Sequence, residues 1–142
     1  MHVNLHHQRP GYIFLVTALM AGTIATATTI SLLLLGLAAV RSSYAFQTSV
    51  QALAYAQACV ERGLLELRDN DAYDGEANIA FSLGSCSILT DGGSGNAYRS
   101  LCTEGTSGQS TRRLQIHIRY ILPTTRVQSY QEVTAFTLCD DV

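Results

Sequence analysis

This sequence has no lysine, only two prolines, and a long stretch without formal charge. No formal charge occurs between Arg9 and Arg41, and no lysine occurs anywhere, so all 9 basic residues other than histidine are arginine. With 11 acidic residues, the net charge is -2 and the pI is about 6.0. A dedicated nucleic-acid-binding protein is usually strongly basic, so this balance argues against that class. The only prolines are Pro10 and Pro123, which leaves a long stretch that a helix can occupy.

Motifs for catalysis, phosphate binding and metal binding are also missing. Serine, histidine and aspartate occur, but no nucleophile elbow joins them, and the glycine-rich stretch 92–96 lacks the lysine of a phosphate-binding loop. The cysteines form no CxxC pair and have no histidine at zinc-finger spacing. We interpret His2, His6 and His7 as part of a positively charged tail, and His117 as a solvated residue on a strand. The sequence therefore predicts no enzyme, no cofactor and no metal site.

A long apolar segment, Gly11–Val40, follows the last N-terminal charge. A helix needs about 20 apolar residues to cross the core of a bilayer, whereas a cleaved secretory signal has an apolar core of about 7–15 residues. The triplet at 25–27 resembles a signal-peptidase site, but the most apolar block, residues 31–40, lies after it. We therefore predict that the segment is retained as a membrane-spanning helix. Arg9 on its short side favours a cytoplasmic N-terminus, with the bulk of the chain outside.

The helical pattern does not end with the apolar segment. After Arg41, apolar residues recur at spacings of three, four and seven, which describes one face of a helix. This predicted stripe consists of Phe46, Val50, Leu53, Val60, Leu64 and Leu67. We predict one helix from Tyr12 to Arg68, ended by the polar residues 68–75. A single-pass anchor with a helical stalk is an alternative interpretation of the same pattern.

After Gly75 the sequence changes to short segments separated by turn residues. The predicted strands lie at 78–83, 86–90, 97–104 and 113–122, with a last strand within 127–138. Loops are predicted at 91–96 and 105–110. We expect an α+β fold in which the amphipathic second half of a long N-terminal helix packs on a small antiparallel β-sheet with disulfides. The other face of the sheet would be in water.

The four cysteines, Cys59, Cys86, Cys102 and Cys139, all follow the apolar segment. An even number behind a membrane-targeting segment indicates disulfides in an oxidising compartment, with buried free thiols in a reducing compartment as the alternative. Three pairings are possible. We favour the one in which Cys59–Cys86 joins the helix to the sheet and Cys102–Cys139 joins the C-terminal segment to a central strand.

The whole layout resembles the type IV pilins and the pseudopilins of type II secretion. A short basic leader that ends in glycine, followed by an aromatic residue and an uninterrupted apolar helix, is similar to their class III signal. The motifs that carry the resemblance are RPGYIFLV (9–16), AQACVERGLLELRDN (56–70), GSCSI (84–88) and SYQEV (129–133). In the bacterial pilin-like proteins that these motifs resemble, the helix cysteine pairs with the cysteine of GSC, which here implies Cys59 with Cys86.

The resemblance implies how the chain is processed and where it resides. Prepilin peptidase would cleave between Gly11 and Tyr12 and methylate the new amino group of Tyr12. The chain would begin as a single-pass protein of the inner (cytoplasmic) membrane and end in an extracellular filament or at the cell surface. Its partners would be prepilin peptidase, other pilin subunits and the inner-membrane assembly platform. The implied parts are a leader peptide at 1–11, a transmembrane and filament-core helix at 12–40, and an extracytoplasmic pilin-like α+β domain at 41–142 that includes the amphipathic helix 41–68.

Val16 departs from the family pattern. Most pilins have a glutamate at this position, the fifth of the mature chain, where it is thought to pair with the amino terminus of a neighbouring subunit. A buried ammonium is favourable only with such a partner. Minor pseudopilins at filament tips also lack the glutamate, because no subunit lies above them. Val16 therefore favours a minor or tip subunit over the bulk subunit of a filament.

Two functions from different classes follow. The first is a structural subunit, of the minor kind, of a pilus or pseudopilus-like filament that serves adhesion, motility, secretion or DNA uptake. The second is a non-polymerising, signal-anchored extracytoplasmic binding domain that keeps residues 1–11. A local patch could contact nucleic acid, but a solvated sheet face is the simpler interpretation of its arginines. The residues of that patch would be Arg112, Arg113, Arg119 and Arg126.

Overall fold

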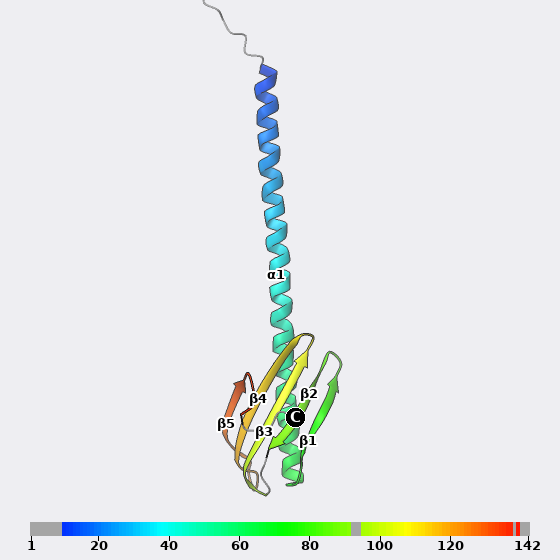
Figure 1. Ribbon diagram of the computed structural model, residues 1–142, viewed down its shortest axis with the longest axis vertical. Coiled ribbons are helices and arrows are strands. Elements are labelled where there is room, and N and C mark those ends of the chain that lie inside the picture. Colours follow the sequence, from blue (N-terminus) through cyan, green and yellow to red (C-terminus); the bar gives the residue numbers. More distant parts are fainter. Residues whose placement is uncertain (1–9, 92–94, 138, 140–142) are drawn as a thin grey trace, which may run out of the picture. The chain divides into compact units, whose positions relative to one another are not determined.

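One long helix and five strands make up the computed structural model, which describes residues 10–91, 95–137 and 139 (Figure 1). The elements are α1 (Pro10–Asp69), β1 (Gly75–Phe81), β2 (Gly84–Asp91), β3 (Ala97–Ser107), β4 (Ser110–Tyr120) and β5 (Arg126–Val133). The predicted α+β class is therefore confirmed. The chain forms two compact units that divide between Ser43 and Tyr44, within α1, and we call them the helical unit and the sheet unit.

In the helical unit, residues 11–43 form a helix whose side chains are exposed, apart from the half-buried Val16. Among the described residues, α1 is the one helix that is long and apolar enough to cross a membrane. The threonine and serine hydroxyls in its first half donate to a carbonyl oxygen three or four residues earlier, at 2.8–3.1 Å. These hydroxyls belong to Thr17, Thr23, Thr26, Thr28, Thr29 and Ser31. Because their polar groups are satisfied within the helix, they are compatible with lipid.

The strands form one antiparallel sheet in the order β1-β2-β3-β4-β5, so each strand pairs with its neighbours in the sequence. Two turns differ from the prediction. The first hairpin turns at 82–83 rather than at 84–85. In the third hairpin Ser107 pairs with Ser110, so only Gly108 and Gln109 form the turn and the predicted loop at 105–110 is wrong. Gly108 has a φ of 56°, a left-handed conformation that glycine adopts easily, so it suits a two-residue turn and the flanking polar residues can stay in the strands.

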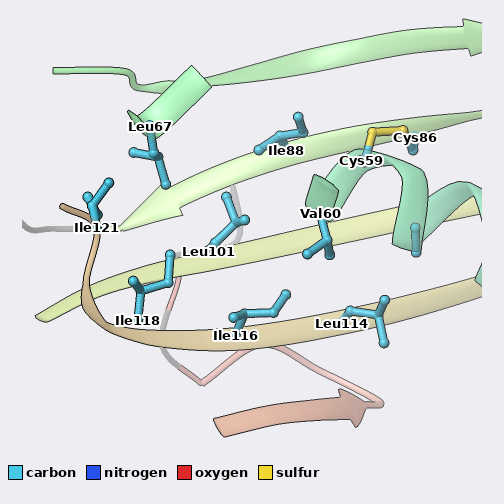
Figure 2. Close-up of a cluster of buried hydrophobic side chains, with 11 residues drawn as sticks. Cys59, Val60, Leu67, Cys86, Ile88, Leu101, Leu114, Ile116, Ile118 and Ile121 are labelled. Carbon is cyan, nitrogen blue, oxygen red and sulfur yellow. A yellow bond between two sulfur atoms is a disulfide. The ribbon is translucent and has the colours of Figure 1, made fainter. Parts of the chain in front are cut away.

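The core of the sheet unit lies between α1 and one face of the sheet (Figure 2). Leu114, Ile116 and Ile118 alternate along β4 and are each at most 1% exposed, as the alternating pattern of this strand predicts. Val60 and Leu67 reach them from α1. The remaining buried members of the cluster are Ala56, Cys59, Cys86, Ile88, Leu101 and Ile121.

The helix face that packs on the sheet is not the predicted one at its N-terminal end. Phe46 and Val50 are 72% and 50% exposed, whereas Ala52 and Ala56 are fully buried. The physical reason is Gly105 on β3, where a Cβ atom would overlap the backbone oxygen of Ala52 and the backbone nitrogen of Ala56. Because Gly105 has no side chain and Ala52 and Ala56 have only a methyl group, the helix can lie close to the sheet here. Larger residues on the helix face would not fit there.

The C-terminal segment crosses the sheet face that points away from α1. Gln115 of β4 exchanges hydrogen bonds of 2.9 and 3.0 Å with Thr137, and Cys139 is bonded to Cys102 of β3. This face was expected to be in water, but Gln115 is only 7% exposed. The expectation was therefore only partly right, because the chain after β5 turns back over this face of the sheet.

Candidate functional site

Two disulfides fasten the sheet unit, and they have the pairing favoured from the sequence. Cys59 of α1 is bonded to Cys86 of β2 (Figure 2), and their Cα atoms are 6.3 Å apart. Cys102 of β3 is bonded to Cys139, with Cα atoms 6.2 Å apart. All four side chains are at most 5% exposed. The loops that they close span 27 and 37 residues, and each closure contributes roughly 3.5–4 kcal/mol in the chain-entropy model.

The predicted processing boundary lies in the first turns of α1. Gly11 and Tyr12 are both exposed, and Tyr12 is 73% exposed. A Cβ atom on Gly11 would meet nothing within 4 Å, so the helix itself does not require glycine at this position. Val16 follows Tyr12 by one helical turn, on the same side of the helix. The residues before Pro10, including three histidines, lie outside the described residues.

The apolar segment supplies no counter-charge for an amino group at Tyr12. The sequence places no aspartate or glutamate between Tyr12 and Glu61. The charged residue in that interval is Arg41, whose positive charge cannot pair with an ammonium group. An amino group created at Tyr12 would therefore find no carboxylate on the apolar segment of its own chain or of an identical copy.

The arginines suggested as a nucleic-acid patch are partly engaged within the sheet unit. Arg112 forms an ion pair with Glu132 at 2.6 Å, and Arg113 forms one with Glu104 at 2.5 Å. The other two are Arg119 and Arg126, which are exposed. The four residues therefore do not form one basic surface, since two of them are neutralised by neighbouring strands.

Arg99 is a buried cation that the sequence reasoning did not single out. It lies on β3 and is 3% exposed. Its Nη1 donates to the carbonyl oxygen of Asp71 at 2.6 Å, and its Nη2 donates to that of Tyr73 at 3.3 Å. Arg99 thereby holds the loop between α1 and β1 on the sheet. The alternation Arg99, Leu101, Thr103 could have placed its side chain on the α1 side.

His117 has no catalytic surroundings in the described part of the chain. It is half-buried rather than solvated, and its Nδ1 lies 3.4 Å from Oγ of Ser100. Within residues 10–91, 95–137 and 139, no group of three or more His, Cys, Asp or Glu is placed to hold a metal ion. His117 is therefore best described as a residue of the outer sheet face.

Two tyrosines of the sheet unit have raised pKa values. Burial raises the pKa of Tyr73, and the negative charges of Glu76 and Glu66 add to the effect. Burial also raises the pKa of Tyr130, against an opposing hydrogen bond from Gln57. Each phenol therefore keeps its proton to higher pH than a solvated tyrosine does.

Comparison with known proteins identifies no relative, because no protein-family model, no curated protein and no solved structure matches the chain. Function must therefore be sought in the chain's own features. These are the part of α1 over Gly11–Val40, which carries no formal charge and is exposed apart from Val16, and a small disulfide-bonded sheet unit.

Proposed function

We propose that this chain is a structural subunit, of the minor kind, of a type IV pilus or pseudopilus-like filament. Prepilin peptidase cleaves it between Gly11 and Tyr12, and it assembles through its apolar helix to serve adhesion, motility, secretion or DNA uptake. The observation that carries the proposal is α1 itself. This helix runs without a break from Pro10 to Asp69, is uncharged over Gly11–Val40 and exposed there apart from Val16, and its last part belongs to a disulfide-bonded α+β unit.

The extent of the uncharged helix supports an assembly role over a simple anchor. Tyr12–Val40 spans roughly 43 Å at 1.5 Å per residue, whereas the hydrocarbon core of a bilayer is about 30 Å thick. Ala18, Gly22 and Ala25 are small residues of the kind that let helices approach closely. After Arg41 the helix again lacks formal charge as far as Glu61. Such a surface is suited to contact with other helices once it leaves the membrane.

Val16 supports a minor position in the filament. In a filament of identical copies, every Tyr12 amino group would lie in an apolar core without a carboxylate, because the chain has none before Glu61. An uncompensated buried charge is costly. A subunit present once or rarely, beside a different pilin that supplies the carboxylate, avoids that cost.

Cleavage by a prepilin peptidase tests the proposal. The full chain, co-expressed in membranes with the peptidase, is expected to lose residues 1–11 and gain one methyl group, measured by intact mass. Gly11→Val is expected to block the reaction, while the matched control Gly22→Val, in the same helix and equally free of neighbours, is cleaved normally. A wild-type chain that stays uncleaved would instead favour a non-polymerising, signal-anchored binding domain.

A further inference from the structure

A cleft lies in the sheet unit where the first turns of its helix meet the β3–β4 turn. It consists of two adjoining hollows of about 270 and 470 Å³ that share Tyr44, Thr48 and Gly108. The other lining residues are Ala45, Gln47, Gln51, Leu83, Ser107, Gln109 and Ser110. We call the two hollows together the turn cleft.

The lining of the turn cleft combines an aromatic ring with neutral polar groups. No lining residue carries a formal charge. Tyr44 is 66% exposed, and the polar groups are amides and hydroxyls, which donate and accept hydrogen bonds. A charged ligand would lose hydration here without gaining a counter-charge, and a purely apolar ligand would leave the amides unpaired. The lining suits a ligand that has both an apolar face and many neutral hydroxyls.

Several of these groups are held in place before any ligand binds. Oγ of Ser107 donates to Oε1 of Gln51 at 3.1 Å, so the amide nitrogen of Gln51 is the end that a ligand could bind. The hydroxyls of Thr48 and Ser110 are hydrogen-bonded to each other at 3.0 Å across the cleft. Groups that are already ordered lose less entropy when they bind.

Gly108 keeps the turn cleft open. A Cβ atom at this position would lie 3.5 Å from Cγ2 of Thr48 and 3.9 Å from the hydroxyl oxygen of Tyr44. Any side chain at Gly108 would therefore project into the space between these two residues.

We propose that the turn cleft binds a neutral saccharide unit, with Tyr44 stacking on the apolar face of a pyranose ring and Gln51 donating to its hydroxyls. A pyranose has the required combination of an apolar face and neutral hydroxyls, and aromatic rings favour such stacked contacts. This binding is independent of filament assembly, so either proposal can fail without the other.

Saturation-transfer NMR on the full, disulfide-bonded chain tests this site. The chain is held in micelles of dodecyl-dimethylamine oxide, because a maltoside detergent would itself present a neutral disaccharide. The probes are cellobiose and N,N′-diacetylchitobiose, which distinguish a plain hexose from an acetamido sugar, and a galacturonic acid dimer serves as the charged comparator. Binding of at least one neutral probe with a Kd on the order of 1 mM is expected, with none for the charged dimer.

Two variants and one control decide whether binding occurs in the turn cleft. Tyr44→Ala removes the stacking ring, and Gly108→Asn fills the cleft with a residue that tolerates the left-handed conformation. Each is expected to weaken binding at least about tenfold. The control Tyr98→Asn removes another exposed tyrosine, which has a φ of 55° and lies at the opposite end of β3, and it should bind as the wild type does. The proposal is overturned if neither neutral probe binds, if the charged dimer binds equally well, or if both cleft variants bind normally.

Discussion

Replacing Gly105 by alanine should push α1 outward from the sheet and destabilise the sheet unit. The added Cβ would overlap the backbone oxygen of Ala52 and the backbone nitrogen of Ala56, and it would lie 3.0 Å from Cβ of Ala56. Backbone atoms cannot rotate out of the way, so the helix must move outward. That movement lengthens the buried 3.0 Å hydrogen bond from Oγ1 of Thr103 to the carbonyl oxygen of Ala56.

The expected loss for Gly105→Ala combines two effects. Overpacking a well-packed core costs about 1–3 kcal/mol. Weakening one buried hydrogen bond adds about 1 kcal/mol. A total of about 3 kcal/mol lowers the Tm of a unit of about 100 residues by roughly 12–24 °C, because each kcal/mol shifts such a Tm by about 4–8 °C.

Gly63→Ala is the matched control. Its Cβ would meet only the side-chain ends of Leu101 and Ile88, at 3.0–3.3 Å, and alanine improves the helix by about 1 kcal/mol. Its net effect is expected to stay within about 1 kcal/mol. Thermal unfolding is followed by tyrosine fluorescence, since all tyrosines except Tyr12 lie in the sheet unit. A Gly105→Ala chain that unfolds at the wild-type temperature would refute the close approach of helix and sheet.

Three further predictions concern the stability of the sheet unit. The double variant Cys102→Ser/Cys139→Ser should lose about 4 kcal/mol in urea unfolding, and a loss below about 1 kcal/mol would mean that the disulfide constrains little. Leu67→Ala should cost about 2–5 kcal/mol, whereas Phe46→Ala should cost less than about 0.5 kcal/mol because Phe46 is exposed, and equal losses would contradict the assigned helix face. The pKa of Tyr73 is higher in the folded chain than in the unfolded chain, so the unfolded chain releases this proton first as the pH rises. The contribution of this phenol to the free energy of unfolding is therefore fully present below about pH 10 and is lost above it. Tyr73→Phe should make the fall of the urea midpoint shallower, and an unchanged slope would speak against burial of the phenol.

Much of the fold could be predicted because it follows from local patterns. The uncharged run and the absence of proline after Pro10 indicate one helix, and its predicted ends lie within two residues of the observed ones. The alternation along β4 indicates which side chains are buried. The favoured cysteine pairing is confirmed, although the sequence alone left three pairings open and the resemblance implied Cys59 with Cys86.

The parts that were predicted wrongly depend on contacts between distant residues. The helix face was assigned by hydrophobicity, but Gly105 selects the small residues Ala52 and Ala56 from a strand that lies far along the chain. The favoured pairing of Cys102 with Cys139 correctly joins the C-terminal segment to a central strand. The hydrogen bonds between Gln115 and Thr137, which hold that segment on the outer sheet face, follow no local pattern. The composition of residues 105–110 suggested a loop, whereas β3 and β4 continue through this stretch and leave a turn of only two residues, Gly108 and Gln109.

Of the candidate sites, the one that is a local sequence motif could be predicted, and those that depend on contacts between distant residues could not. The boundary at Gly11 and Tyr12 rests on a sequence motif, and cleavage there stays a prediction because the fold of the full chain does not show whether a peptidase cuts it. The turn cleft could not be predicted, because it forms only when the first helical residues of the sheet unit meet Gly108 in space. Arg99 was missed because its partners are backbone oxygens, which no sequence motif reveals.

The most direct test of the assembly proposal is the intact mass and N-terminal sequence of the chain isolated from its own cells, in both the membrane fraction and the material sheared from the cell surface. We expect a chain that begins at methylated Tyr12 and is present in the sheared fraction in small amounts relative to another pilin. A chain that begins at Met1 and occurs only in membranes would contradict it.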